Sequence, residues 1–401
     1  MNILFLTISR ISNIEDRGIY TDLMRELISC GNEVYIASPT ERRFGKPTHV
    51  IESPHCHILK IKTLNIQKTN VIEKGIGTLL LESQFDSAIR RYWADVKFDL
   101  VLYSTPPITF NKVIESIKRR CSSRSYLMLK DIFPQNAVDL GMMKNGGLLH
   151  RLFRKKEVRL YEISDRIGCM SPANCQYVIT HNPTVDPTKV ELCPNAIKPV
   201  EIPTATENER NTLLSKSGIP TDKTLFIYGG NLGKPQGVDF LLEVVGENER
   251  LSNSHIIIIG NGTEYHRIQQ WFDIQRPKNA TLLSALPKAE YDQLVRTADV
   301  GLIFLDRRFT IPNFPSRLLS YLENSMPVLL ATDTNTDMGR MAEENRFGLW
   351  CESGDIHTFI HNMCQLAGNK AMIDEMGKNG RTYLLDNYTV DKAAYIILHN
   401  S

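Results

Sequence analysis

A glycine-rich stretch just past the middle of the chain has the residue types of a phosphate site. Residues 229–233, Gly-Gly-Asn-Leu-Gly, follow a short apolar segment, Leu225 to Tyr228, that is typical of a buried strand. The apolar residues from Val238 to Val245 suit a helix after the turn. Glycine lets a backbone turn sharply beside a ligand, and the free N–H groups and dipole of a helix N-terminus favour an anion. This stretch therefore predicts a site for a nucleotide diphosphate, although an ordinary strand-to-helix turn explains it equally well by itself.

One carboxylate stands where α/β proteins bind their ligands. Asp131 comes shortly after the apolar segment Ser125 to Leu129, and ligand sites of parallel sheets form at the carboxyl ends of strands. Asp131 is therefore a candidate to orient or deprotonate a substrate hydroxyl group, provided that it lies within hydrogen-bond reach. Capping of the loop before Pro134 is an equally good explanation of this aspartate.

The segment from Leu148 to Leu160 combines an apolar stripe with basic flanks at helical spacing. The apolar residues are Leu149, Leu152, Phe153 and Leu160, and the basic residues are Arg151, Arg154, Lys155, Lys156 and Arg159. Such a composition suits a helix that lies on an anionic membrane. A solvated basic face above an ordinary core stripe explains the pattern nearly as well.

Strand-like apolar segments recur along the chain, and helical patterns separate most of them. In the first half they are Asn2–Ile8, Glu33–Ser38, His57–Ile61, Phe98–Tyr103, Ser125–Leu129, Arg166–Met170 and Lys189–Cys193. In the second half they are Leu225–Tyr228, Ser254–Gly260, Ala280–Leu283, Val300–Leu305, Pro327–Ala331 and Phe347–Cys351. Alternating helices and Val/Ile/Leu-rich strands predict parallel sheets covered by helices on both faces.

Between the two series, the segment from Ile197 to Asn211 loses apolar periodicity and gains prolines and polar residues. We predict a first Rossmann-like domain at residues 1–196, a linker at 197–211, a second Rossmann-like domain at 212–385 and a C-terminal helix at 386–401. The ligand of two such domains is expected in the cleft between them.

Composition excludes several classes of protein. At 401 residues the chain is too long for one ordinary core, and a formal net charge of +2 excludes a strongly cationic nucleic-acid binder. The N-terminus lacks a basic flank and a cleavage signal, so a first strand is expected there rather than a signal peptide. No apolar segment approaches the roughly 20 residues that cross a bilayer. The eight cysteines lack metal-ligand spacing and are expected to be reduced, buried and cytosolic, without a metal or disulfide role.

The motifs of other nucleotide enzymes are missing from the sequence. Only Gly18 follows the first strand, where dinucleotide dehydrogenases carry Gly-x-Gly-x-x-Gly. There is no Walker loop and no Gly-x-Ser-x-Gly turn. A glycine turn in the second of two α/β domains favours a sugar-nucleotide enzyme of the GT-B architecture, in which two Rossmann-like, doubly wound parallel-sheet domains face each other across a cleft.

A set of short motifs resembles those of family 4 glycosyltransferases, in order and spacing, over nearly the whole chain. In the first domain they are Asn2–Thr7 with Arg17–Leu27, Lys130–Pro134, and Ser171 and Pro172 with Cys193–Asn195. In the second domain they are Gly230–Gly237, Ile259–Gly262, and Pro315–Leu322 with Pro327 and Val328. The likeness is to bacterial O-antigen and capsule enzymes, and within them to N-acetyl-L-fucosaminyltransferases.

The resemblance implies catalytic roles for Asp131, Arg317 and Lys234. Arg317 would hold the donor diphosphate and neutralise the leaving group, Lys234 would assist, and Asp131 would act on the acceptor hydroxyl. An exposed helix arginine and a solvated loop lysine are the structural alternatives for Arg317 and Lys234. The implied donor-binding residues are Gly18, Gly230, Asn231, Leu232, Gly233, Gln236, Gly260, Asn261, Leu286, Pro287, Asn313, Phe314, Ser316 and Glu323.

The sequence departs from the family at one point. Family 4 enzymes usually carry two glutamates eight positions apart for the sugar and the ribose, but Pro312 and Ser320 stand at those positions. Glu323 is expected to replace the second glutamate in part. In place of the first, backbone N–H groups of residues 310–314 are expected to hold the sugar.

The resemblance implies transfer of a sugar, N-acetyl-L-fucosamine, from a UDP-sugar to an acceptor sugar on a polyprenyl diphosphate in O-antigen or capsule biosynthesis. It also implies retention of the anomeric configuration, and neither a metal ion nor a cofactor is expected. The segment 148–160 would lie on the membrane, so a cytoplasmic enzyme, peripheral on the inner face of the plasma membrane, is expected. A sugar-nucleotide 2-epimerase of the same architecture and a non-enzymatic two-domain sugar-binding protein are the alternatives.

Overall fold

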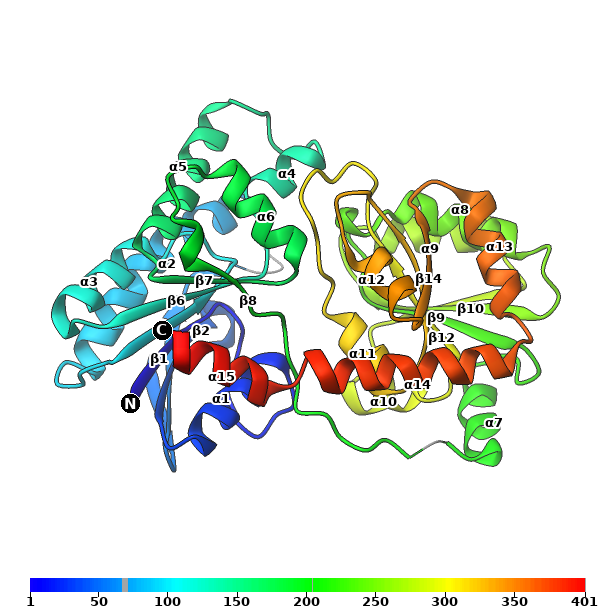
Figure 1. Ribbon diagram of the computed structural model, residues 1–401, viewed down its shortest axis with the longest axis horizontal. Helices are drawn as coiled ribbons and strands as arrows, with labels where there is room; N and C mark the ends of the chain where they lie inside the picture. Colours follow the sequence, from blue (N-terminus) through cyan, green and yellow to red (C-terminus); the bar gives the residue numbers. More distant parts are fainter. Residues whose placement is uncertain (67–70, 204, 401) are drawn as a thin grey trace. The chain divides into compact units, whose positions relative to one another are not determined.

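The computed structural model describes residues 1–66, 71–203 and 205–400 (Figure 1). The chain divides into two compact units. Unit 1 comprises Met1–Lys198 together with the segment from Thr389 onward, and unit 2 comprises Pro199–Tyr388. Within the described residues each unit contains one sheet made mainly of parallel strands, so the predicted pair of Rossmann-like α/β domains is confirmed.

Unit 1 is organised around an eight-stranded sheet in the order β3-β4-β2-β1-β5-β6-β7-β8. The strands are β1 (Asn2–Leu6), β2 (Glu33–Glu41), β3 (His49–Ser53), β4 (Cys56–Thr63), β5 (Leu100–Ser104), β6 (Arg124–Leu129), β7 (Arg166–Cys169) and β8 (Val190–Leu192). Neighbouring strands are parallel except at the edge, where β3 is antiparallel to β4. The sequence pattern does not predict β3, because this edge strand is only partly buried and lacks a continuous apolar segment.

The last helix of the chain belongs to unit 1. α15 (Val390–Asn400) packs beside α1 (Ile19–Ser29), where Ile397 and Met24 share one buried core (Figure 1). The helix predicted at 386–401 therefore begins four residues later, at Val390. The other helices of unit 1 are η1 (Arg42–Phe44), α2 (Val71–Tyr92), α3 (Asn111–Cys121), α4 (Gln135–Asp139), α5 (Leu148–Ile163), α6 (Pro172–His181) and η2 (Pro187–Lys189).

Unit 2 contains a six-stranded parallel sheet in the order β11-β10-β9-β12-β13-β14. The strands are β9 (Thr224–Asn231), β10 (Ser254–Asn261), β11 (Ala280–Ser284), β12 (Val300–Phe304), β13 (Val328–Thr332) and β14 (Gly348–Glu352). The helices are α7 (Glu207–Lys216), η3 (Lys234–Gln236), α8 (Val238–Asn248), α9 (Tyr265–Gln275), α10 (Lys288–Val295), α11 (Arg317–Glu323), α12 (Met338–Glu344), α13 (Ile356–Leu366) and α14 (Lys370–Asn387).

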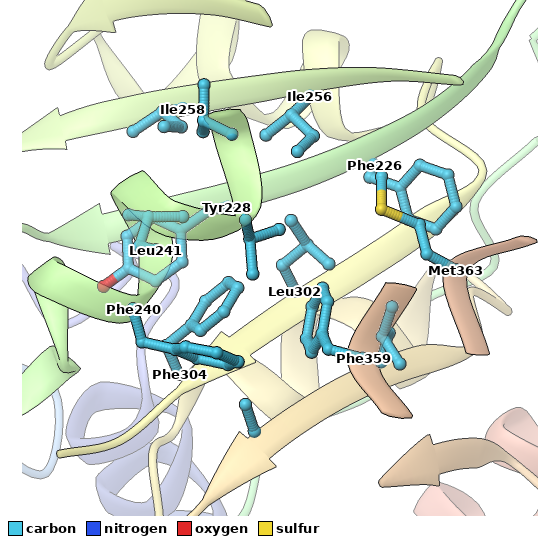
Figure 2. Packing of buried hydrophobic residues seen from close by; sticks show 14 of the residues in the cluster. Phe226, Tyr228, Phe240, Leu241, Ile256, Ile258, Leu302, Phe304, Phe359 and Met363 are labelled. Atoms are coloured by element: carbon cyan, nitrogen blue, oxygen red, sulfur yellow. The ribbon is translucent and has the colours of Figure 1, made fainter. Parts of the chain in front are cut away.

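Aromatic side chains fill the core of unit 2 between the sheet and helices α8 and α13 (Figure 2). Phe226 and Tyr228 come from β9, Phe304 from β12, Phe240 from α8 and Phe359 from α13. The rings of Phe304 and Phe359 stack with their centroids 5.2 Å apart. Burying a large apolar side chain contributes about 1.5–3 kcal/mol to the free energy of unfolding. This packing fixes the carboxyl ends of β9 and β12, from which the predicted site loops start.

The connection between the two units is shorter than the linker predicted at residues 197–211. Ile197 already pairs with Thr389 in unit 1, and α7 begins at residue 207 in unit 2. Thr206 and Glu209 form a capping box at the start of α7, in which each side chain accepts a hydrogen bond from the other residue's N–H. The sequence Thr-x-x-Glu was a visible helix-start signal that the prediction of an irregular segment missed.

Candidate functional site

The predicted phosphate loop joins β9 to α8 in unit 2. β9 ends at Asn231, η3 follows, and Gly237 begins α8 with a left-handed backbone, φ 55°. A Cβ atom on Gly237 would lie 3.0 Å from the carbonyl oxygen of Leu305, so both the angle and the space require glycine. The loop lies at the carboxyl edge of a parallel sheet, where α/β folds bind their ligands.

Two glycines of this edge are required by the protein's own packing. β9 and β10 pair with Gly230 opposite Gly260, and a Cβ atom on Gly260 would lie 1.9 Å from the Gly230 carbonyl oxygen. A Cβ atom on Gly229 would lie 2.0 Å from the Oη of Tyr291. The neighbours that require glycine at Gly229 and Gly260 are thus a tyrosine and the adjacent strand, and the donor contact of Gly260 stays a prediction.

Gly230 differs, because its open side faces Arg317. Its φ is 123°, and a Cβ atom there would lie 3.7 Å from the Nη2 of Arg317. This Nη2 donates a hydrogen bond to the Oε1 of Gln236 at 2.7 Å, and the guanidinium carbon lies 4.2 Å from the centre of the Tyr228 ring. The Nη1 of Arg317 is shielded from solvent and has no hydrogen-bond partner among the described residues. The structure thus brings three predicted residues together, Gly230, Gln236 and Arg317. Arg317 is half-buried, so the structural alternative of an exposed helix arginine is wrong.

Two tyrosines absent from the predicted site hold this group of residues in place. The Tyr228 hydroxyl donates a hydrogen bond to the Oε1 of Gln236 at 3.2 Å. The Tyr321 hydroxyl donates to the Ile227 carbonyl at 3.1 Å and accepts from the Gly229 N–H at 3.2 Å. Burial raises the pKa of Tyr321, so its hydroxyl keeps its proton. Both tyrosines stand among apolar residues, where the sequence pattern indicates only core.

In unit 1, Asp131 follows β6 at the carboxyl edge of the sheet. Its carboxylate oxygens accept hydrogen bonds from the Asn136 side chain at 2.8 and 2.9 Å, and its N–H donates to the Thr105 hydroxyl at 3.1 Å. Burial raises the pKa of Asp131 to about 6 and lowers the pKa of the adjacent Lys130 to about 8. A carboxylate with this pKa can accept a proton near neutral pH, so the chemistry of a base is open to Asp131.

Four matches relate the chain to known proteins. Residues 209–383, most of unit 2, match the family described as Glycosyl transferases group 1. The probable glycosyltransferase WbjE of Pseudomonas aeruginosa is 21% identical over 298 residues, which cover 73% of this chain and 71% of WbjE. Two solved structures share the fold. Sucrose-phosphate synthase from Thermosynechococcus elongatus has a TM-score of 0.76 and 15% identity, and the match covers 99% of this chain and 97% of that chain. Anabaena HepE in complex with UDP-glucose has a TM-score of 0.69 and 12% identity, and the match covers 100% of this chain and 98% of that chain.

These matches support a GT-B glycosyltransferase. The predicted GT-B fold is confirmed. The family match spans every donor-binding residue that was predicted in unit 2, whereas Gly18, Asp131 and α5 lie outside it. The predicted N-acetyl-L-fucosamine specificity stays a prediction.

Leu232 is part of the protein core. Its side chain is fully buried, its N–H donates to the Asn261 carbonyl at 2.8 Å, and its carbonyl accepts from the Glu264 N–H at 2.9 Å. The structure therefore contradicts the predicted donor contact of Leu232, whose polar groups are occupied within the protein. The Asn261 carbonyl is occupied in the same way.

Other predicted donor residues lie at the surface of unit 2. Lys234 is exposed on η3 and has no ion-pair partner among the described residues, so donor contact and a solvated lysine both stay open for it. Asn231 and Ser316 are exposed, and Gly233 precedes η3. The segment predicted to flank the nucleobase, Leu286 and Pro287, begins α10 at the surface. Their donor contacts stay predictions.

The loop before α11 uses one of its backbone N–H groups within the protein. The Asn313 N–H donates to the Thr336 hydroxyl at 3.0 Å, which in turn donates to the Asp333 carboxylate at 2.9 Å. The predicted sugar contact of the Asn313 N–H is thus contradicted, and Phe314 packs against Tyr388 with centroids 6.0 Å apart. Asp333 follows β13 at the carboxyl edge, and burial raises its pKa to about 6. The prediction missed this carboxylate, although an aspartate directly after an apolar strand was a visible signal.

Glu323 and Gly18 have partners within their own units. The Glu323 carboxylate is buried and accepts a hydrogen bond from the Val200 N–H at 3.0 Å, which favours a structural role over the predicted ribose contact. The Gly18 N–H donates to the Asp22 carboxylate at 3.1 Å, and its φ of 174° is an extended conformation open to any residue. The backbone angle therefore does not require glycine there, and the donor contact of Gly18 stays a prediction.

The first turns of α5 expose apolar side chains. Leu148 is 87% exposed, Leu149 62% and Leu152 44%, whereas Leu160 is fully buried. Phe153 is half-buried against Phe133, with ring centroids 5.1 Å apart. An ordinary core stripe therefore describes only the second half of the helix.

The basic residues of α5 fall into two groups. Arg154 donates to the Glu157 carboxylate at 2.7 Å and to the Asn182 side chain at 2.6 Å, and the Arg159 guanidinium pairs with Glu115 at 2.5 Å. The basic residues without an ion pair among the described residues are Arg151, Lys155 and Lys156. The predicted membrane face thus loses Arg154 and Arg159, whose charges are neutralised within the protein.

None of the described helices is long and apolar enough to cross a membrane. In that part of the chain no group of three or more His, Cys, Asp or Glu side chains could hold a metal ion.

All eight cysteines are free thiols, but Cys30 and Cys364 are exposed, so the prediction of buried cysteines is wrong for these two.

Proposed function

We propose that this glycosyltransferase moves a sugar from a UDP-sugar to an acceptor sugar carried on a polyprenyl diphosphate, in O-antigen or capsule biosynthesis. The observation that carries the proposal is the Arg317 guanidinium, held by Gln236 and Tyr228 beside the bare backbone of Gly230. A similar fold in HepE is solved with UDP-glucose, which favours a UDP-sugar donor. N-acetyl-L-fucosamine is the proposed sugar, on the sequence resemblance alone.

In the proposed reaction the acceptor oxygen bonds to the anomeric carbon of the donor sugar while the bond from that carbon to the diphosphate oxygen breaks. The electron pair of the broken bond stays on UDP, and the hydroxyl proton passes to the departing phosphate oxygen. Arg317 neutralises the charge that grows there, because its planar, always charged guanidinium can hold two phosphate oxygens. Attack on the face that the diphosphate leaves retains the anomeric configuration, and Arg317 supplies the positive charge without a metal ion.

Asp131 is proposed to orient the acceptor hydroxyl before attack. Its carboxylate stands at the carboxyl edge of the unit 1 sheet, and the Asn136 amide fixes its plane. A hydrogen bond from the acceptor hydroxyl to this carboxylate would make the oxygen more nucleophilic.

The exposed end of α5 is proposed to rest on the cytoplasmic face of an anionic membrane, where a polyprenyl-linked acceptor is found. Leu148, Leu149 and Leu152 supply an apolar surface, and Arg151 and Lys155 supply positive charge beside it. A peripheral attachment of this kind needs no membrane-spanning helix.

Thermal unfolding with nucleotides tests the donor part of the proposal. UDP is expected to raise the Tm more than UMP does, because only UDP carries the β-phosphate for Arg317, and more than GDP or dTDP does. In Arg317→Ala the difference between UDP and UMP should vanish. Stabilisation by none of these nucleotides would contradict the proposal. With the UDP-sugar alone, a 2-epimerase would give a new sugar nucleotide, whereas this transferase should give at most slow hydrolysis.

A further inference from the structure

A second group of cations lies at the carboxyl edge of the unit 1 sheet, separate from the basic residues of α5. It consists of Arg10 in the loop after β1, Lys46 in the loop after η1, and Lys60 in β4. Among the described residues none of the three has a carboxylate within ion-pair distance. Their charges are therefore not neutralised within the protein.

The two neighbouring arginines, Arg42 and Arg43, do have carboxylate partners. Arg42 pairs with Glu73 at 2.8 Å, and Arg43 pairs with Glu41. Four acidic and basic side chains of the same edge thus neutralise one another. The uncompensated charge belongs to Arg10, Lys46 and Lys60.

Lys60 is a buried lysine that is only 4% exposed. Its ammonium donates to the Ile11 carbonyl at 2.7 Å and to the Ser38 hydroxyl at 3.1 Å, so it ties the loop after β1 to β2 and β4. Burial, together with the nearby charges of Arg10 and Lys46, lowers the pKa of Lys60 to about 8. Like charges this close repel, so an anion bound among them would stabilise all three.

Two further features of this edge suit a bound anion. The Arg10 guanidinium carbon lies 3.9 Å from the centre of the Phe44 ring, which holds this exposed arginine in one place. Thr40 lies two residues after Ser38 on the same face of β2, and its buried hydroxyl has no hydrogen-bond partner among the described residues.

We propose that Arg10 and Lys46 bind the diphosphate of the acceptor substrate, while Lys60 positions the Arg10 loop and adds its charge. The inference rests on the proposed function, since that function supplies a diphosphate-bearing acceptor. In the sheet β1 and β6 are separated only by β5. At about 4.8 Å per strand their ends lie roughly 10 Å apart. A diphosphate held beside β1 therefore lets a short saccharide attached to it extend toward Asp131 after β6.

Binding of farnesyl diphosphate, a short soluble prenyl diphosphate, tests the site in the full chain without any donor. The wild type should bind it at least about tenfold more tightly than farnesol, which lacks the charge-assisted hydrogen bonds. Arg10→Gln and Lys46→Gln should each weaken this binding about tenfold. Arg42→Gln removes the same charge from a residue that Glu73 already neutralises, so its affinity should stay within about twofold. The Tm increase caused by UDP should be unchanged in all three variants.

Several results would overturn the inference. One is unchanged affinity in Arg10→Gln and Lys46→Gln, and another is an equal loss in Arg42→Gln, which would show a diffuse positive field. A loss of binding to phosphatidylglycerol vesicles with unchanged farnesyl diphosphate affinity would assign these residues to bulk lipid instead. A wild type that binds farnesyl diphosphate but gains no stability from UDP would count against the donor proposal alone.

Discussion

The two units differ in how far they bury the cations that are proposed to bind anions. In unit 2, Arg317 lies on the Tyr228 ring and is hydrogen-bonded to Gln236, so it is half-buried and already oriented. In unit 1, Arg10 also lies on an aromatic ring, that of Phe44, but both Arg10 and Lys46 are exposed. A side chain held in its bound orientation loses little entropy on binding, whereas exposed side chains adapt to a ligand whose position varies. The difference fits a small soluble donor in unit 2 and a lipid-borne acceptor in unit 1.

Arg154 and Arg317 sharpen this comparison, because both are half-buried arginines on helices. Arg154 is neutralised by Glu157, and the environment of Arg317 consists of neutral groups, Gln236 and Tyr228. A carboxylate partner thus marks the structural arginine, and its absence marks the arginine that is free to bind an anion.

The largest effect is expected at Arg317. Arg317→Ala should lower kcat/KM by about 10²–10³-fold, because one preorganised charge facing the leaving group is lost. Lys234→Ala should lower kcat/KM less than about tenfold, since this lysine is exposed and has no ion-pair partner in the part of the chain that the structure describes. The matched control is Arg340→Ala on α12, an exposed arginine 3.8 Å from Glu344, which should leave steady-state turnover unchanged. A greater loss in Lys234→Ala would reverse the order given to the two cations.

The next effect is expected at Asp131. Asp131→Asn should lower turnover by about 100-fold, the scale of a lost catalytic carboxylate, with little change in the donor-induced Tm increase. Asp139→Asn on α4 is the control, and its turnover should stay within about twofold. Full activity in Asp131→Asn would leave this carboxylate with the loop-capping role alone.

The pH dependence provides a separate test of Asp131, whose folded pKa is raised to about 6 by burial. The folded state then binds a proton more strongly than the unfolded state, whose pKa is about 3.9. The free energy of unfolding should therefore fall as pH rises from about 4 to 6, and the fall should be smaller in Asp131→Asn. Turnover of the wild type should rise through the same range as the carboxylate ionises. Denaturant unfolding measures the free energy of unfolding, and initial rates measure turnover, each between pH 4 and pH 8. The same pH dependence in Asp131→Asn and the wild type would show that Asp131 is not the titrating group.

A smaller effect is expected at Gly230. Gly230→Ala places a methyl group beside the Arg317 guanidinium at φ 123°, so UDP affinity should fall about tenfold. Gly246→Ala is the matched control, because this helical glycine of α8 has open space around it. Gly246→Ala should raise the free energy of unfolding by about 0.5–1 kcal/mol and leave UDP affinity unchanged. Calorimetric titration with UDP measures the affinity of both variants. Equal affinities in Gly230→Ala and Gly246→Ala would exclude Gly230 from the diphosphate site.

The smallest effect is expected on α5. The double variant Leu149→Ser with Leu152→Ser should bind phosphatidylglycerol vesicles about three- to tenfold less well in flotation, because it loses exposed apolar surface. Ile274→Ser in unit 2, 76% exposed, is the control and should float like the wild type. Arg154→Gln should lower the Tm instead, since it leaves Glu157 buried without its partner. Equal flotation of all variants would remove α5 from the membrane proposal.

Residue spacing predicted the meeting of Gly230, Gln236 and Arg317, although about eighty residues separate the loop from α11. The prediction worked because glycine, an amide and a guanidinium each stand at a strand or helix end, and parallel strands bring such ends to one edge. It failed at Leu232 and Asn313, because the partners of their N–H groups are the Asn261 carbonyl and the Thr336 hydroxyl. Which neighbour a backbone group meets depends on strand pairing and loop geometry, and local sequence carries neither.

The sequence by itself determined the two α/β units, the glycine loop and the residue types of the site, since hydrophobic periodicity and glycine positions are local properties. Tertiary structure alone decided which charges are neutralised. Arg154 and Arg10 are indistinguishable as basic residues in the sequence, but of the two only Arg154 meets a carboxylate, that of Glu157, among the described residues. The same holds for the glycine loop, where only Gly230 leaves its open side to Arg317. The physical reason is that the interaction energy of a charge, and the space beside a glycine, depend on which residues the fold places next to them.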